Sequence, residues 1–381
     1  MTRRLVRAVA WVCATLLGAS VIFFGYAWFD WQPEPPVYGG TANALWARHQ
    51  WAGEAHTEAE YRALAGTLTR NRITDVFFHV GPLTGDGRIP PARYGHAAEL
   101  LAALRRLAPG VRAQAYVGQV ERSGGGPLDL RAPATRAHIL DADRALLDVG
   151  FAGIHYDIEP IYPDDRNFLD LLTRTREVTR ARGRLLSVAL EQPGLADWTQ
   201  PLFRLVLPRG STHYPPRPTA AYLKAVADRV DQVAIMTYDS EAPTRALAGW
   251  HFAHHTERTL SLIGDRVTVF MGVPTYRSPT PWAEDLPTAL RGVRQGVARL
   301  RRPPRRPYGV AVYADWTTSD RDWAAYRAGW LGETRWPRSG ATRERPSDDV
   351  PPYARGHRPS ARERHDGQLN LTLAIHAAKA D

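Results

Sequence analysis

The sequence predicts an α/β protein built as a (β/α)8 barrel and preceded by one N-terminal transmembrane or signal-anchor helix. From residue 43 onward, eight short runs rich in β-branched or aromatic residues alternate with longer amphipathic segments, as repeated βα units do. Before them, a long apolar stretch follows three arginines, which is the pattern of a membrane anchor. A doubly wound open sheet is the alternative, but the glycine-rich turn expected after its first strand is missing.

The expected strands and helices follow each other in strict alternation along the chain. The strands are expected at 44–50, 73–80, 111–117, 153–158, 185–190, 232–238, 267–273 and 309–313. The helices are expected at 58–70, 97–107, 135–149, 167–182, 222–229, 256–263 and 288–301, with a last one near 323–330. In barrels of this kind the functional side chains lie at the carboxyl ends of the strands, so the active site is expected there.

Residues 1–31 are expected to form a cytoplasmic stub and a membrane-spanning signal anchor. Arg3, Arg4 and Arg7 precede an apolar stretch over 8–29, which as a helix is long enough to cross a hydrocarbon core of about 30 Å. The arginines favour the cytoplasmic side, so the rest of the chain is expected in the periplasm or outside the cell. The alternative is a cleaved signal peptide that releases a secreted protein.

Three further parts follow this anchor in the 381 residues. The proline-rich segment 32–42 is expected to be a short linker, and 43–332 the catalytic barrel domain. Residues 333–381 are crowded with arginine and proline and lack periodicity, so we expect a disordered tail. The single cysteine, Cys13, excludes an intramolecular disulfide and a cysteine-based metal cluster.

The formal charge of +10 comes almost wholly from arginine, because lysine occurs only at Lys224 and Lys379. A basic surface favours anionic cell-wall polymers or lipid headgroups. No nucleic-acid-binding motif accompanies the charge, so nucleic acid is not an expected partner. No cofactor or metal is expected either. His251, His254 and His255 have a helical spacing, but no carboxylate signature accompanies them, which is typical of a solvated rim rather than a metal site.

The fourth expected strand carries the strongest chemical signal. Residues 153–159 read GIHYDIE, and alternate side chains of a strand share one face. His155, Asp157 and Glu159 therefore point into the barrel, with the two carboxyl groups about 6 to 7 Å apart at its catalytic end. Two acids this close cannot both ionise freely, which raises one pKa and keeps a proton donor near neutral pH. Glu159, nearer the mouth, is the predicted donor.

This segment resembles the signature strand of family 18 glycoside hydrolases, the chitinase-like enzymes, which reads Asp-x-x-Asp-x-Asp-x-Glu. Three further segments resemble that family in the expected order. Residues 236–239, Met-Thr-Tyr-Asp, resemble its Met-x-Tyr-Asp, and 272–277 resemble its Gly-x-Pro-x-Tyr-Gly. Residues 309–313 resemble its last strand, and the likeness as a whole covers about 43–330.

The resemblance implies a glycosidase that acts on glycans containing N-acetylhexosamine, such as peptidoglycan or chitin-like chains, by substrate-assisted retaining hydrolysis. Carried over by position, Glu159 is the general acid and base, Asp157 orients the acetamido group, and Tyr238 hydrogen-bonds its carbonyl. The residues expected to bind the polysaccharide or oligosaccharide, from the resemblance and from their places at strand ends, are His155, Met236, Asp239, Tyr276, Tyr313, Trp316 and Glu191.

Three positions depart from the family pattern. Its first two aspartates fall on Ala152 and His155, and the tryptophan of its last strand falls on Tyr313. In place of the lost carboxylate, His155 is expected to donate a hydrogen bond to Asp157 and hold it ionised. The departures leave open a catalytically silent glycan-binding barrel. Glu191 leaves open a two-carboxylate glycosidase. The third alternative is that the two acids of the fourth strand serve only in structural ion pairs with arginines.

Overall fold

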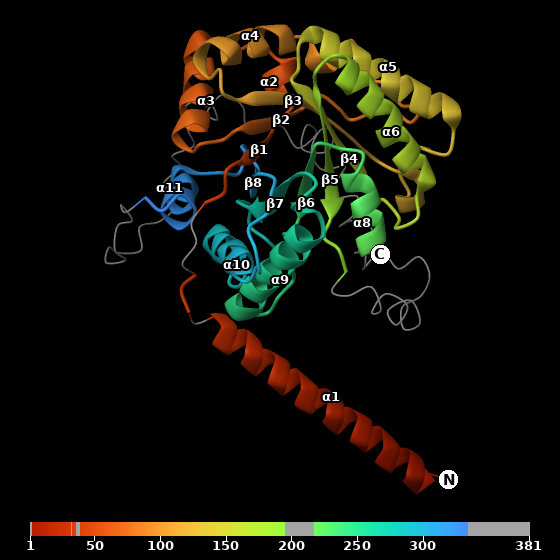
Figure 1. Cartoon of the computed structure of the whole chain (residues 1–381), viewed down its shortest axis with the longest axis vertical. Coiled ribbons are helices and arrows are strands. Elements are labelled where there is room, and N and C mark those ends of the chain that lie inside the picture. The colour runs from red at the N-terminus through yellow and green to blue at the C-terminus, as the bar shows by residue number, and fades with distance from the viewer. Residues whose placement is uncertain (1, 32, 36–38, 195–216, 334–381) are drawn as a thin grey trace, which may run out of the picture.

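The computed structural model describes residues 2–31, 33–35, 39–194 and 217–333, and its centre is a closed barrel of eight parallel strands (Figure 1). Each strand pairs with the next, and β1 pairs with β8 to close the barrel. The predicted barrel is therefore confirmed. The strands are β1 Ala44–Ala47, β2 Asp75–His79, β3 Arg112–Val120, β4 Gly153–Glu159, β5 Leu185–Glu191, β6 Gln232–Met236, β7 Thr268–Pro274 and β8 Tyr308–Tyr313.

Helices form a layer around the barrel (Figure 1). Short capping motifs fix where some of them begin: Thr57 and Glu60 form a reciprocal capping box at the start of α3, and Ser319 and Asp322 do the same at α11. The helices are α1 Thr2–Trp31, α2 Gln50–Gly53, α3 Glu58–Arg70, η1 Pro91–Tyr94, α4 Ala97–Leu107, η2 Arg122–Gly124, α5 Pro133–Val149, α6 Arg166–Ala181, α8 Ala220–Ala227, α9 Arg245–Ile263, α10 Leu286–Ala298 and α11 Asp320–Gly329.

The inside of the barrel is filled in layers, as a packed core. At the amino ends of the strands, buried Asp75 accepts hydrogen bonds from Arg112 at 2.6 Å, Gln114 at 2.9 Å and Gln232 at 3.0 Å. Above this polar layer lies a buried apolar cluster that includes Trp46 and Phe77. This apolar layer separates the polar groups at the amino ends from the carboxyl ends, where the functional side chains of such barrels lie.

Several elements begin or end away from their expected positions, and in two of them a side-chain hydrogen bond accounts for the difference. The first strand was expected to reach residue 50, but β1 ends at Ala47, since the N–H of Arg48 donates to the carboxylate of Asp315 at 3.1 Å. The sixth helix was expected from 256, but α9 begins earlier because the hydroxyl of Thr244 caps it by accepting from the N–H of Leu247 at 3.3 Å.

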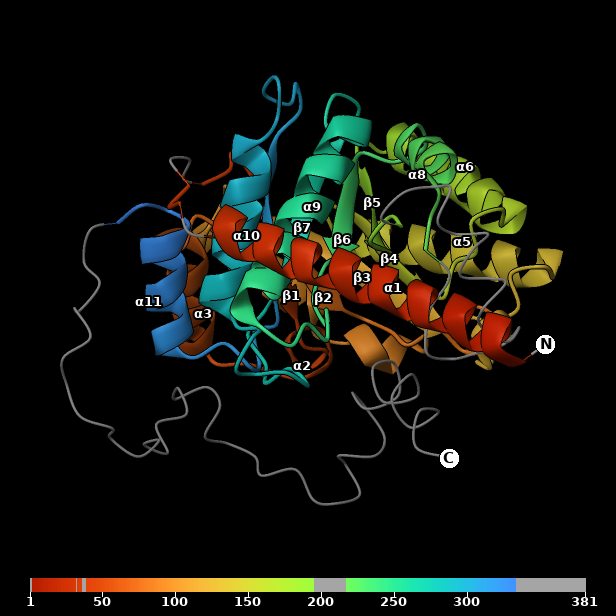
Figure 2. The same cartoon turned by 90° about the horizontal axis from the view of Figure 1, so that it is seen from below.

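Helix α1 extends away from the barrel and lies below it (Figures 1 and 2). Its last turns contact α9, with the rings of Phe23 and Trp250 4.8 Å apart. In the segment expected to be a linker, Glu34 accepts from Arg294 of α10 at 2.9 Å. No helix in the described ranges has the length and apolar character that a membrane crossing needs, so the predicted span is not confirmed. The predicted tail, apart from its first residue, lies outside the described residues.

Candidate active site

The two acids of β4 lie at the carboxyl end of the barrel, and they share the inward face as the alternation predicts. The residues between them belong to the opposite face: Ile154, Tyr156 and Ile158 are buried in the apolar cluster between strands and helices. Asp157 is 5% exposed. Glu159 is the last residue of the strand and is only partly buried. Of the two, Glu159 is therefore the one that a molecule arriving from solvent can touch.

Asp157 is held by a tyrosine of the neighbouring strand. The hydroxyl of Tyr116 on β3 donates to Oδ2 of Asp157 over 2.5 Å. Gly118, which pairs with Asp157 in the register, leaves room for this contact, because a Cβ there would lie 2.9 Å from the Asp157 carbonyl oxygen and 3.2 Å from the Tyr116 ring. Oδ1 of Asp157 is buried and has no hydrogen-bond partner among the described residues. Glu159 is the neighbouring acid, and a hydrogen bond from it lowers the pKa of Asp157.

Of the two acids, Glu159 is the one that carries the proton. Burial raises the pKa of Asp157, whereas the hydrogen bonds from Tyr116 and Glu159 lower it. Burial raises the pKa of Glu159 well above its ordinary value, and the negative charges of Asp157 and then Glu191 raise it further. Because the partners push the two pKa values apart, the favoured state is ionised Asp157 beside protonated Glu159. This is the arrangement of a proton donor.

His155 has a different role from the one expected. Its Nε2 accepts from the indole N–H of Trp46 at 3.2 Å, and its Nδ1 bonds the hydroxyl of Ser187 at 2.8 Å. The ring is fully buried and stacks on Phe77 at 3.6 Å. The expected hydrogen bond from His155 to Asp157 is therefore wrong, and Tyr116 provides that bond instead. The expected substrate contact is wrong as well, because no surface of His155 is free to meet a ligand. Burial lowers its pKa, so the ring is neutral.

An aromatic wall, formed by Tyr238, Tyr276, Tyr313 and Trp316, lies across from the acids. Tyr238 follows β6, and its ring centre lies 5.1 Å from that of Tyr313 and 6.0 Å from that of Tyr276. Trp316 stands edge-on to Tyr313 at 5.5 Å. Three of the rings, those of Tyr238, Tyr313 and Trp316, pack against the inner cluster that contains buried Met236.

Tyr238 shares its surroundings with both acids. Burial is the largest cause that raises the pKa of its phenol. Smaller contributions come from Tyr313 and Tyr276, and then from the charges of Asp157 and Glu159. Its ring fits only because residue 272 is glycine: a Cβ there would lie 3.0 Å from the Tyr238 ring and 2.8 Å from a backbone oxygen. The structure thus brings together the three residues that the sequence assigned to catalysis.

A buried glutamate that the sequence did not single out holds the turn after β6. The N–H groups of Asp239 and Ser240 donate to the two carboxylate oxygens of Glu284, at 2.7 and 2.8 Å. This fixes Asp239 in a left-handed conformation, with φ of +58°. Its side chain then accepts from the hydroxyl of Tyr276 at 2.6 Å. Glu284 precedes α10 in a loop, where neither strand alternation nor a motif marks it.

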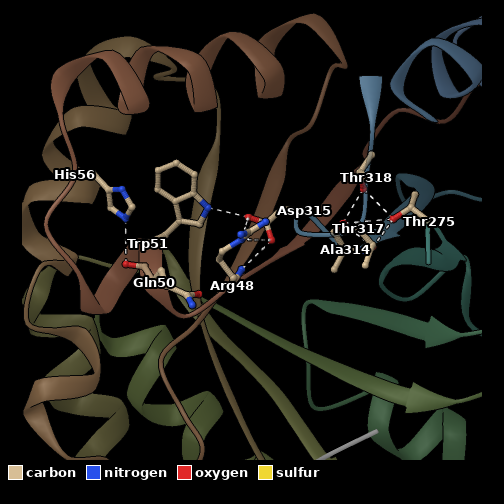
Figure 3. A network of polar contacts seen from close by, with 9 residues as sticks. All are labelled: Arg48, Gln50, Trp51, His56, Thr275, Ala314, Asp315, Thr317 and Thr318. Carbon is tan, nitrogen blue, oxygen red and sulfur yellow. Dashed lines mark hydrogen bonds and ion pairs between the residues drawn. The ribbon is translucent and has the colours of Figure 1, made fainter. Parts of the chain in front are cut away.

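The turn after β8, which follows Tyr313 and carries Trp316, is held by two sets of polar contacts (Figure 3). The carboxylate of Asp315 accepts from Trp51 at 2.8 Å and forms an ion pair with Arg48 at 3.3 Å. On the other side, the hydroxyl of Thr275 donates to the Tyr313 carbonyl at 3.1 Å. These bonds tie β8 to β1 and β7, so the wall has a rigid support.

Glu191 lies at the end of β5, near enough to Glu159 for its charge to raise the pKa of that acid. With its amide nitrogen turned toward Glu191, Gln192 donates to it at 3.2 Å and accepts from Arg217 at 3.2 Å. Glu191 is thus at the catalytic end, as expected. No group of three or more potential metal ligands exists within the described residues.

Comparison with solved structures finds the same barrel in cortex-lytic enzymes. The spore cortex-lytic enzyme SleL of Bacillus cereus aligns with 77% of this chain and 75% of its own, at 13% identity and a TM-score of 0.51. SleL of Bacillus megaterium QM B1551 aligns over 78% and 76%, at 12% identity and 0.50. The chain has the fold of these barrels.

A class V chitinase from Pseudomonas fluorescens Pf-5 also matches, over 76% of this chain and 99% of its own, at 18% identity and a TM-score of 0.49. No protein-family profile matches the sequence, and no curated protein sequence matches it significantly. The likeness that the fourth strand predicts is confirmed for the fold alone, through the two cortex-lytic enzymes, and their identities of 12% and 13% indicate a divergent sequence.

Replacing Asp315 by alanine tests the support of the aromatic wall. The change leaves the Arg48 guanidinium and the Trp51 N–H without their shared acceptor, so we expect a loss of about 2 kcal/mol in the free energy of unfolding. The midpoint of thermal unfolding should fall by a few degrees. As a control, Asp86→Ala breaks a surface pair with Arg88 and should change stability by less than about 0.5 kcal/mol. Equal effects of the two variants would contradict the role given to Asp315.

Proposed function

We propose that this protein is a glycoside hydrolase that cleaves glycans containing N-acetylhexosamine, with Glu159 as general acid and base. The observation that carries the proposal is the coupled pair on β4. Glu159 is partly exposed and holds the proton, because burial and the charge of Asp157 raise its pKa. A protonated carboxyl at the mouth of a barrel is what protonation of a glycosidic oxygen requires near neutral pH.

The proposed mechanism is substrate-assisted retention. The carbonyl oxygen of the substrate's N-acetyl group bonds to the anomeric carbon while the bond to the leaving oxygen breaks and Glu159 gives that oxygen its proton. The product is a cyclic oxazolinium ion, whose positive charge ionised Asp157 stabilises. Glu159, now ionised, takes a proton from the water that opens this ring, which restores the starting state and retains the configuration.

The other residues at the mouth suit this chemistry. Tyr238 keeps its proton, because burial and the nearby acids raise its pKa, and it can donate to the acetamido carbonyl. The rings of Tyr276, Tyr313 and Trp316 offer apolar faces of the kind on which sugar rings stack. The cluster that contains Met236 supports Tyr313 and Trp316, and Asp239 restrains Tyr276 through their hydrogen bond.

Changing Glu159 to glutamine should abolish hydrolysis. The amide cannot donate a proton to the leaving oxygen, so kcat should fall by about 100-fold or more. The measurement is a panel of matched oligosaccharides with and without the N-acetyl group, in which we expect turnover only of the acetylated members. Turnover by Glu159→Gln at the wild-type rate would refute the assignment.

Glu191→Gln is the matched control, because it removes a second carboxylate from the same mouth. We expect this variant to keep most of its activity, since the substrate's own acetamido group is the proposed nucleophile. Loss of all activity in Glu191→Gln, together with hydrolysis of substrates that lack the acetyl group, would instead indicate the two-carboxylate mechanism. Binding of glycans without turnover of any would indicate the silent barrel.

Tyr116→Phe should move the acidic limb of the pH–rate profile to higher pH. The Tyr116 hydroxyl lowers the pKa of Asp157 by stabilising its anion, so removing the hydroxyl raises that pKa. Asp157 is then still protonated, and inactive in its proposed role, at a pH where the wild-type residue has ionised. We expect a shift of about one pH unit, measured from kcat/KM across the acidic range.

Tyr326→Phe controls for the loss of a buried phenol, because Tyr326 lies in α11 away from the acids. Its pH profile should match that of the wild type. An unshifted acidic limb in Tyr116→Phe would show that the hydrogen bond does not set the ionisation of Asp157.

We also propose that α1 tethers the barrel to the outer face of the cytoplasmic membrane. Support comes from the arginines at 3, 4 and 7 and from large apolar side chains of α1 that are exposed, such as Trp11, Ile22 and Phe29, each 74% or 75% exposed. In host cells, the full chain should sediment with membranes, and external protease should digest the barrel once the outer layers are removed. A soluble product lacking 1–31 would indicate signal cleavage, and a protease-protected barrel would contradict export.

A further inference from the structure

A row of aromatic and imidazole rings leads away from the catalytic pair, across the carboxyl ends of β3, β2 and β1. Tyr116, which holds Asp157, has its ring centre 4.7 Å from that of His79, the last residue of β2. His79 in turn stands edge-on to His49, with 6.4 Å between ring centres. Nδ1 of His49 is buried and has no hydrogen-bond partner among the described residues. This side of the mouth therefore holds an unsatisfied polar atom a short way from the reacting groups.

Arg93 brings a positive charge to the same place. It lies in η1, whose backbone packs closely on α2, since a Cβ at Gly53 would be 3.1 Å from the Arg93 carbonyl oxygen. The side chain is partly buried, and its charge lowers the pKa of both His49 and His79, after the larger effect of burial. Within the described part of the chain, Arg93 has no ion-pair partner.

The neighbouring arginine has an ion-pair partner. Arg48 is turned toward Asp315 and pairs with it (Figure 3), and its charge also lowers the pKa of His49, after that of Arg93. The exposed carboxylate of Glu54 raises the pKa of His49, so it acts at the outer end of the row. At His79, nearer the acids, burial has the largest effect and lowers the pKa to about 3, followed by the charges of His49 and Arg93. Arg93, which forms no ion pair within the described residues, is thus close enough to both imidazoles for its charge to lower their pKa values. These rings are neutral at pH 7, and each can donate one N–H.

We propose that Arg93, His49 and His79 form a binding site for a carboxylate on the glycan, and this inference rests on the proposed function. The site lies one side chain away from the catalytic pair, beyond Tyr116, so the acidic group would belong to a sugar unit next to the N-acetylhexosamine at the point of cleavage. A planar guanidinium pairs with carboxylates through two parallel N–H donors, and neutral imidazoles add donors without needing a counter-charge. The substrate class is therefore an acidic glycan rather than neutral chitin.

Two natural glycans carry that chemistry beside an N-acetylhexosamine. One is a peptide-free strand of alternating N-acetylglucosamine and N-acetylmuramic acid, which has a free lactyl carboxylate. The other alternates N-acetylglucosamine with a hexuronic acid. Binding of each is measured by titration calorimetry on the full-length Glu159→Gln chain, so that turnover does not interfere. The comparison ligands are the same oligosaccharides with their carboxyl groups amidated, and a neutral N-acetylglucosamine oligomer of equal length.

We expect at least one acidic oligosaccharide to bind about tenfold or more tightly than its amidated form. Adding Arg93→Gln should remove that preference and leave the affinity for the neutral oligomer unchanged, and His49→Phe should reduce the preference in the same direction. Arg62→Gln is the control, because it removes one charge from an exposed helix position and should have no effect. The ligand that shows the preference identifies the source of the carboxylate.

Equal binding of the acidic and amidated forms would overturn the inference. So would an Arg93→Gln variant that loses acidic and neutral ligands alike, or one that still discriminates between them. The proposed function is tested separately, by turnover in the wild-type chain. If the wild type hydrolyses glycans and binding shows no preference for the carboxylate, only the inference fails. If the preference is found without turnover, only the hydrolase assignment fails.

Discussion

The chemistry proposed for this barrel depends on one buried interaction, the proton shared between Asp157 and Glu159. Burying two carboxyl groups at one end of a barrel costs free energy. The cost is small only when one carboxyl group is neutral and the other is hydrogen-bonded. Both conditions hold here: Tyr116 donates to Asp157 at 2.5 Å, and burial with the charge of Asp157 keeps the proton on Glu159.

Tyr116 compensates for the absence of a carboxylate at position 155, where the family pattern has one, by donating a hydrogen bond to Asp157. In the family pattern, a carboxylate occupies the position of His155, directly below Asp157. Here a neutral imidazole fills that space, fixed by Trp46 and Ser187 and stacked on Phe77. A hydroxyl from the neighbouring strand then supplies the hydrogen bond that Asp157 needs. A neutral ring thus stands where a negative charge would otherwise be, and Tyr116 donates the hydrogen bond, so Asp157 ionises more readily than it would above a second carboxylate.

The sequence predicted the barrel and the acid pair well because both follow from short-range periodicity. Alternation along one strand is enough to place Asp157 and Glu159 on the same face, and repeated βα units are enough to close eight strands. The partners of these residues depend on contacts between strands, which a single strand does not reveal. Tyr116 was missed because only the β3–β4 register brings it to Asp157. Glu284 and Asp315 were missed because they lie in loops, where no periodicity marks a buried carboxylate.

Different strands place different chemical groups at the mouth of the barrel, and their positions restrict how a glycan can lie across it. Carboxyl groups lie at the ends of β4 and β5, and aromatic rings lie at the ends of β6 to β8. The guanidinium of Arg93 and the imidazoles of His49 and His79 lie near the ends of β1 and β2. An acidic substituent over Glu159 and Glu191 would be repelled, whereas the same substituent beyond Tyr116 would meet a donor with positive charge. Sugar rings would rest on the wall formed by Tyr238, Tyr276, Tyr313 and Trp316. A strand that alternates neutral and acidic units would therefore fit in one register only, with its neutral N-acetylated unit over the catalytic pair.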